Sequence, residues 1–153
     1  MMNEASEIYN YQMKIDDLRE SLSCDFVAVA IAKSASEGSE ITWQYASGNL
    51  NNRYKRIILR SGKGIAGIVF KTGKPMIIND VKSDMMNEDL FNYPIVVSEK
   101  LCALIAVPLF QYARVTGVLL VGYRQPTLIS ETFASNLKSL LHNEFGAFDI
   151  KGL

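Results

Sequence analysis

Four glycines and a proline punctuate the segment GKGIAGIVFKTGKP at residues 62–75. Gly62 and Gly64 can adopt backbone angles that other residues avoid, so the chain can turn sharply there. Residues at helical spacing follow the turn, namely Ile65, Ile68, Val69 and Thr72, and the pattern ends at Gly73 and Pro75. A helix that begins after a glycine turn directs free N–H groups outward, and such groups suit an anion. On these residues alone, a plain strand–turn–helix connection is the simpler interpretation.

Few other residues in the chain have the types and spacing needed for covalent or metal chemistry. The two cysteines, Cys24 and Cys102, form no CxxC pair, and the single histidine is His142. No His, Asp or Glu cluster has metal-ligand spacing, and no Ser or Cys lies beside a plausible base in the sequence. We therefore expect a binding module without metal or cofactor, in which both cysteines act as small buried apolar residues.

Length and composition predict one soluble domain spanning residues 1–153. Sixteen basic and sixteen acidic residues cancel, and no basic stripe is present, which argues against nucleic-acid and anionic-membrane partners. The longest apolar run, residues 101–110, is too short to cross a bilayer. The N-terminus has no signal-peptide pattern, so we expect a cytosolic protein with reduced thiols.

Periodicity places helices at both ends of the chain and strands between them. Residues 4–22 carry an apolar stripe at steps of three and four: Ile8, Tyr11, Ile15, Leu18 and Leu22. Packing on the domain's own sheet explains this stripe, although a short dimer seam is the alternative, so we expect a monomer or a weak homodimer. A second helix is predicted over 131–148 after Ser130, with an apolar face of Phe133, Leu137, Leu140, Leu141, Phe145 and Phe148. The predicted strands are 26–32, 41–47, 56–60, 76–78, 103–110 and 115–123.

Two local features qualify this pattern. Residues 79–100 are polar and irregular, which is typical of a lid or binding loop, and Pro94 favours a turn at Tyr93. Pro108 lacks an N–H donor and therefore indicates an edge or a bulge within its strand.

The paired segments 62–81 and 103–126 resemble the GAF domain family. The matching motifs are Gly62 to Gly67, Gly73–Pro75, Asp80, Val107–Leu109 and Gly117–Leu119. The resemblance covers nearly the whole chain. It implies an α/β (α+β) fold with a mainly antiparallel sheet of about six strands. Both terminal helices would lie on one face, and a ligand pocket roofed by the 79–100 region would lie on the other.

The GAF fold itself does not set the ligand, so each subfamily is judged by its functional residues. Several subfamilies are excluded because this chain lacks those residues. Bilin-binding members commonly carry a Cys-His step, whereas Cys102 is followed by Ala103. Free-methionine sulfoxide reductases carry a cysteine in the glycine turn, where this chain has Ala66. Haem binding through His142 is a remote alternative, since that residue lies near the end of the predicted last helix.

The N-terminal helix, the second strand, the GKGIAG turn and the Tyr-Pro-Ile step are similar to those of nitrate receptors within the family. That resemblance implies that Trp43, the amides of Ile65 and Ala66, and Tyr93, Pro94 and Ile95 surround nitrate or a similar small anion. It also implies a sensor that modulates a histidine kinase of a two-component system controlling nitrate respiration. The alternatives are another small ligand, such as a nucleotide or an organic acid, and, more remotely, a sulfoxide-reductase-like enzyme. Trp43 is otherwise explained as a core aromatic residue on a strand.

Overall fold

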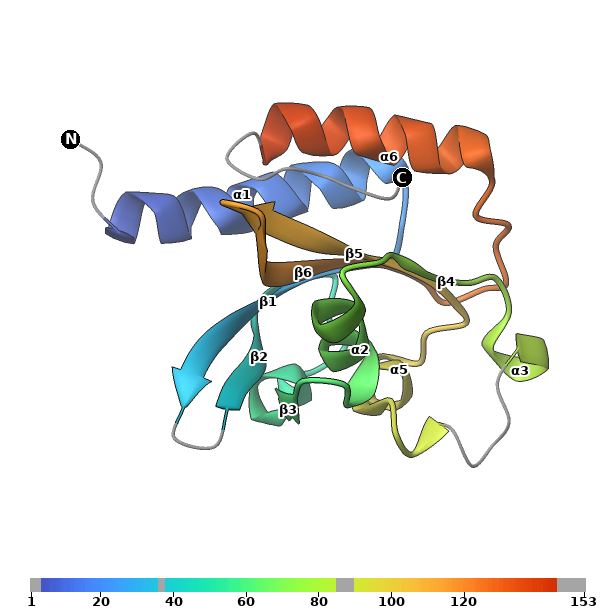
Figure 1. The fold of residues 1–153 in the computed structure, drawn as a ribbon. Coiled ribbons are helices and arrows are strands. Elements are labelled where there is room, and N and C mark those ends of the chain that lie inside the picture. The colour runs from blue at the N-terminus through green and yellow to red at the C-terminus, as the bar shows by residue number, and fades with distance from the viewer. Residues whose placement is uncertain (1–3, 36–37, 85–89, 146–153) are drawn as a thin grey trace.

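A six-stranded antiparallel sheet divides the domain into two layers (Figure 1). The computed structural model describes residues 4–35, 38–84 and 90–145. The strands are β1 (Phe26–Ala35), β2 (Gly38–Ser47), β3 (Ile58–Arg60), β4 (Met76–Ile78), β5 (Ala103–Gln111) and β6 (Arg114–Tyr123). Their order across the sheet is β3-β2-β1-β6-β5-β4, and every neighbouring pair is antiparallel. This arrangement confirms the predicted fold class.

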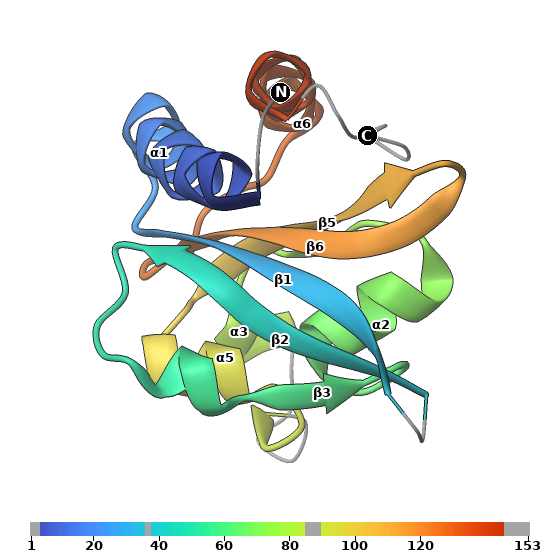
Figure 2. The ribbon, with the colours of Figure 1, turned by 90° about the vertical axis from the view of Figure 1, so that its left-hand side faces the viewer.

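Two long helices, α1 (Glu4–Leu22) and α6 (Glu131–Glu144), cover one face of the sheet (Figure 2). The apolar cluster beneath them includes Ile15 and Leu18 from α1 and Leu137 and Leu141 from α6. The bounds of α1 are those predicted. The predicted last helix was too long, since α6 ends at Glu144 and residues 146–153, which include Phe148, lie outside the described residues. Burial of these apolar stripes holds both helices on the sheet.

Within the described residues, four short helices cover the other face. They are the 3-10 helix η1 (Arg53–Arg56), α2 (Gly64–Thr72), α3 (Val81–Asp84) and α5 (Pro94–Glu99). The predicted strand over 56–60 is therefore reduced to three residues, because the chain coils into η1 before it. Gly73 ends α2 with φ +67°, as the sequence predicted.

The expectation of an irregular 79–100 segment was partly wrong, since α3 and α5 lie within it. Asp84 Oδ2 accepts hydrogen bonds from the N–H groups of Asn79 and Asp80 (both 3.2 Å), and Asp80 Oδ1 accepts one from the N–H of Lys82 (3.1 Å). Pro94 occupies the first turn of α5, where its missing N–H costs nothing, and the predicted turn at Tyr93 is its N-cap. Local capping thus forms helices too short to show a sequence period.

Strict alternation along β2 is interrupted by a bulge. Val29 pairs with Tyr45 and Ala30 with Trp43, which leaves Gln44 unpaired. Trp43 consequently belongs to the cluster under α2 and α5, whereas Tyr45 packs against the cluster under α1 and α6. Two residues that regular alternation would place on one face are directed to opposite faces.

A second register shift lies where Leu109 pairs with Gly117 and Phe110 with Val115, which leaves Thr116 of β6 unpaired. Pro108 does not lie in an edge strand, because β5 is flanked by β4 and β6. β4, however, pairs only with Leu104–Ala106, so Pro108 lies beyond its end. The predicted bulge within the strand of Pro108 was therefore wrong, since the extra residue belongs to β6.

Candidate anion-binding site

The glycine turn brings the first amides of α2 beneath the sheet. Gly62 and Gly64 both have positive φ, +84° and +67°, and the N–H of Gly62 donates to the carbonyl of Gly67 (2.8 Å). A Cβ on Gly67 would lie 2.3 Å from the Arg60 carbonyl oxygen, so only glycine permits this tight loop. Lys63 is the N-cap and supplies no capping acceptor.

The N–H groups of Ile65 and Ala66 have no acceptor from this loop or from another element of the described chain. They lie in the first helical turn, where N–H groups lack partners within the helix and carry partial positive charge. Both side chains are buried, which removes these amides from bulk water. This end of α2 is therefore suited to an acceptor of negative charge.

Trp43 presents a second free donor to the same apolar cluster. Its side chain is 2% exposed, and the indole Nε1 is buried without a hydrogen-bond partner. An unpaired buried donor costs about 1–3 kcal/mol, and an indole N–H has no acceptor lone pair to repel an anion. The side chains of Trp43, Ile65 and Ala66 belong to one apolar cluster.

Helix α5 contributes the third predicted element. Ile95 is buried in the cluster, and Tyr93 packs against it with a half-buried ring. Pro94 is half-buried and, together with Tyr93, lines a surface hollow of about 330 Å³ beside Gly62, Lys63 and Gly64. The six predicted residues lie on the sheet face covered by α2 and α5 (Figure 2), with four in the apolar cluster, Tyr93 packed against it and Pro94 beside the hollow. Trp43, Ile65, Ala66 and Ile95 lie in the cluster rather than along the hollow's lining.

A buried ion pair that the sequence did not indicate fixes the other end of α5. Glu99 is fully buried, and its Oε1 accepts from Arg124 Nη2 and from the N–H of Leu50, both at 2.8 Å. The Arg124 guanidinium also donates to the carbonyls of Glu99 (2.9 Å), Gly48 (3.1 Å) and Asp25 (3.3 Å). The pair ties α5 to the start of β1 and the end of β6. Glu99 and Arg124 are 25 residues apart, so only the tertiary fold reveals them.

The two thiols lie in different surroundings. Burial raises the pKa of Cys24 to about 12, so this thiol stays protonated at neutral pH. Cys102 is half-buried and donates from Sγ to the Arg124 carbonyl (3.1 Å). Cys24 is the small buried residue expected, whereas Cys102 is more exposed than predicted. Among the described residues, no group of three or more His, Cys, Asp or Glu side chains could hold a metal ion.

This fold, with two long helices on one face of an antiparallel sheet and short helices on the other, is that of a GAF domain. The family model described as "GAF domain" matches residues 14–143, and the chain belongs to that family. A comparison with curated proteins found no match.

Solved structures sharpen the relationship. The chain is similar to a hypothetical protein from S. aureus, with 45% identity, TM-score 0.74, and 79% of this chain and 98% of the other covered. It is also similar to NreA from Staphylococcus aureus, whose structure carries mutations in its nitrate-binding site. That match has 43% identity and TM-score 0.78, and covers 84% of this chain and 94% of NreA. A free methionine-R-sulfoxide reductase from Neisseria meningitidis, at 22% identity and TM-score 0.68 over 92% of this chain and 78% of the reductase, shares the fold.

No helix in the described part of the chain is both long and apolar enough to cross a membrane.

Proposed function

We propose that this chain is a nitrate-binding sensor rather than an enzyme. The observation that supports the proposal most directly is that two sets of hydrogen-bond donors have no acceptor in the described part of the chain. The buried Trp43 indole N–H and the first amides of α2, at Ile65 and Ala66, serve one apolar region. Similarity to NreA, a protein with a nitrate-binding site, supports the choice of ligand.

Nitrate suits these donors for a physical reason. It is a weakly hydrated monoanion with acceptor oxygens in one plane, so leaving water costs less than for phosphate or sulfate. The two backbone amides and the indole would each donate a charge-assisted hydrogen bond, which is stronger than a neutral one. Burial of Ile65 and Ile95 excludes water and strengthens such bonds further. No cofactor is needed for this chemistry.

The proposed output is control of a sensor histidine kinase in a two-component system for nitrate respiration, acting in the cytoplasm. The ligand would shift a population of conformations by binding more tightly to the state in which Tyr93–Ile95 closes over the site. The Glu99–Arg124 pair anchors the far end of α5, so a change at its N-terminal end would reorient the helix rather than release it. The reoriented helix would present a different surface to the kinase.

The test is an anion series on the purified protein. Nitrate should raise the melting temperature in proportion to the logarithm of its concentration once it exceeds the dissociation constant. Sulfate and phosphate at equal ionic strength should shift it much less, and chloride serves as the ionic-strength control. Equal stabilisation by sulfate would contradict the proposal.

Calorimetry distinguishes the alternative that the chain binds a nucleotide or an organic acid. Saturable heat with a cyclic nucleotide or a dicarboxylate, together with none for nitrate, would reassign the ligand. The sulfoxide-reductase alternative predicts turnover of methionine sulfoxide that is lost in Cys102→Ser. We expect no turnover in either protein.

A further inference from the structure

An apolar groove lies between α3 and α5, next to the candidate anion site but formed by other side chains. Its volume is about 320 Å³, and its apolar lining residues are Val81, Leu90, Val96, Val97 and Leu101, with Cys102. Val97 is 57% exposed, and Phe91, which follows the lining residue Leu90 in the chain, is 87% exposed. Apolar side chains this exposed around a hollow mark an interaction surface more often than isolated ones do.

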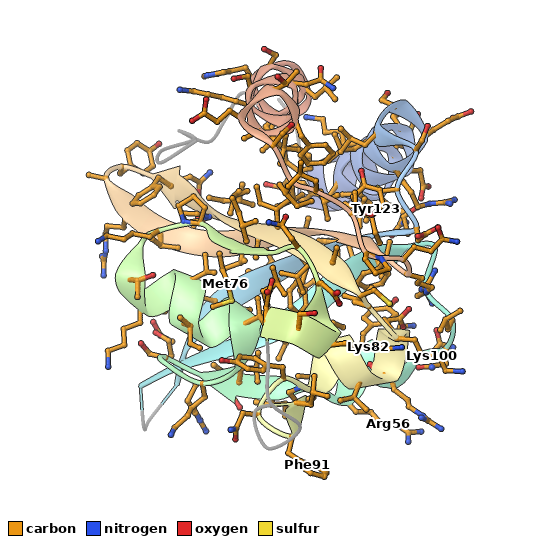
Figure 3. All side chains as sticks on the ribbon, turned by 90° about the vertical axis from the view of Figure 1, so that its right-hand side faces the viewer. Arg56, Met76, Lys82, Phe91, Lys100 and Tyr123 are labelled. Atoms are coloured by element: carbon orange, nitrogen blue, oxygen red, sulfur yellow. The ribbon has the colours of Figure 1, made fainter. Side chains whose placement is uncertain are left out.

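Two lysines, Lys82 on α3 and Lys100 at the end of α5, complete the lining of the groove. Figure 3 shows them near one another on this side of the molecule, with Phe91 farther along it. Both lysines are exposed, and neither has an ion-pair partner within the described part of the chain. The groove therefore combines an apolar floor with two lysines that have no ion-pair partner among the described residues.

The walls of the groove are held by backbone hydrogen bonds. The N–H of Val81 donates to the Cys102 carbonyl (2.7 Å), and the N–H of Leu101 donates to the Val96 carbonyl (3.0 Å). Lys100 has φ +53°, a left-handed conformation uncommon for a residue with a side chain. This conformation ends α5, with the Lys100 N–H donating to the carbonyls of Val96 and Val97.

We propose that this groove docks a segment of a partner protein with an amphipathic apolar face flanked by acidic residues. Apolar side chains of the partner would enter between α3 and α5 and contact Val97, while its carboxylates would pair with Lys82 and Lys100. Charge complementarity selects the acidic partner, and the exposed apolar residues beside the hollow favour a chain segment over a small molecule.

The groove and the candidate anion site share one helix. α5 directs Ile95 and Val96 into the apolar cluster, whereas Val97 faces outward along the groove. A partner protein bound along α5 and a ligand bound at the N-terminal end of α5 would therefore both contact the same six-residue helix. The docking surface itself does not depend on which ligand the domain binds.

The experiment uses a synthetic helical peptide with leucines at i, i+3, i+4 and i+7 and flanking glutamates, titrated into the full chain labelled at its Leu and Val methyl groups. Shifts should concentrate at Val81, Val96, Val97 and Leu101. The variant Lys82→Glu/Lys100→Glu should weaken binding roughly tenfold or more, because attraction becomes repulsion. A peptide with lysines in place of the glutamates should bind that variant better than it binds the wild type.

Matched variants control for net charge and exposed apolar area. Lys74→Glu/Arg114→Glu makes the same change in charge at exposed positions outside the groove lining, and Ile58→Ser removes an exposed apolar side chain from β3. Both should bind the acidic peptide normally, whereas Val97→Ser should not. Loss of binding in the control variants, or methyl shifts outside the groove, would overturn the proposal. A second assay uses phosphatidylserine vesicles. If the peptide does not bind, and the vesicles sediment the wild type but not the Lys82→Glu/Lys100→Glu variant, the groove is a membrane-binding surface and the proposal is overturned.

Discussion

The two faces of the sheet are both apolar, but they differ in how completely their polar groups are paired. Beneath the long helices α1 and α6, the structure records no buried side-chain nitrogen or oxygen without a hydrogen-bond partner among the described residues. The opposite face, covered by short helices, contains the recorded exceptions, which are Trp43 Nε1, Ser98 Oγ and Glu99 Oε2. Folding alone favours the first arrangement, because each unpaired buried group costs free energy.

This contrast assigns different roles to the faces. Long helices with continuous apolar stripes maximise burial and fix the sheet. Short helices that begin at a glycine turn and at Pro94 place several helix termini and unpaired donors close together. The bulge at Gln44 matters here, since it directs Trp43 to the second face and Tyr45 to the first. Of the unpaired groups, only the Trp43 indole N–H belongs to the site where we propose that ligand binds, since Ser98 and Glu99 lie at the other end of α5.

The largest effect is expected from breaking the ion pair behind α5. Arg124→Met leaves the buried Glu99 carboxylate without its counter-charge, which should lower the free energy of unfolding by about 3–5 kcal/mol. The double variant Arg124→Met/Glu99→Gln should recover part of this loss, because the uncompensated charge is gone. Urea unfolding of all three proteins provides the measurement. A double variant no more stable than Arg124→Met would show that the pair does not act through its charges.

A core truncation beneath α6, on the face covered by the long helices, should lower the free energy of unfolding without changing nitrate affinity. Leu137→Ala removes a fully buried side chain beneath α6 and should cost about 2–5 kcal/mol in the free energy of unfolding. The nitrate dissociation constant, measured by calorimetry on the folded protein, should stay unchanged. Leu128→Ala makes the same chemical change at a side chain that is 74% exposed and should alter neither quantity. Weaker nitrate binding in Leu137→Ala would mean that the two faces are coupled.

The sequence predicted those elements whose signals are local or periodic. α1 and β4 have the predicted bounds, and the α2 stop at Gly73 follows from glycine's tolerance of positive φ. β1 extends beyond the predicted residue 32 because pairing with β2 recruits the polar residues Lys33 and Ser34. α3 and α5 were missed because four and six residues are too few to show a helical period.

For the candidate site, the family resemblance predicted six positions, and their role in binding stays a prediction; the structure places four of them in the apolar cluster under the short helices. The sequence could not predict that the Trp43 indole lacks a partner, because this depends on every neighbouring side chain. Nor could it reveal Glu99, a glutamate in a polar segment that becomes fully buried only through its pairing with Arg124. Pairing across the fold leaves no signature in either residue's local sequence.

The donor hypothesis predicts an intermediate effect for Trp43→Phe. The change keeps an aromatic ring but removes the indole N–H, so nitrate binding should weaken by about 1.5–3 kcal/mol. Tyr45→Phe is the matched control, since it removes a polar hydrogen from the neighbouring aromatic residue on the opposite face. Calorimetric titration with nitrate compares the variants. Normal binding by Trp43→Phe with reduced stability would make Trp43 a core residue only.

The smallest expected effect concerns the N-cap of α6, on the face of the sheet that the two long helices cover. Ser130 Oγ accepts a hydrogen bond from the N–H of Phe133 (3.1 Å) and so caps α6. Ser130→Ala should lower the free energy of unfolding by about 1 kcal/mol, because it leaves that N–H group without its partner. Ser139→Ala, at an exposed position inside the same helix, should be neutral or slightly stabilising, since alanine favours helices more than serine does. Both variants should respond to nitrate as the wild type does in thermal melts; a weaker response in Ser130→Ala alone would show that even the end of α6 influences the opposite face.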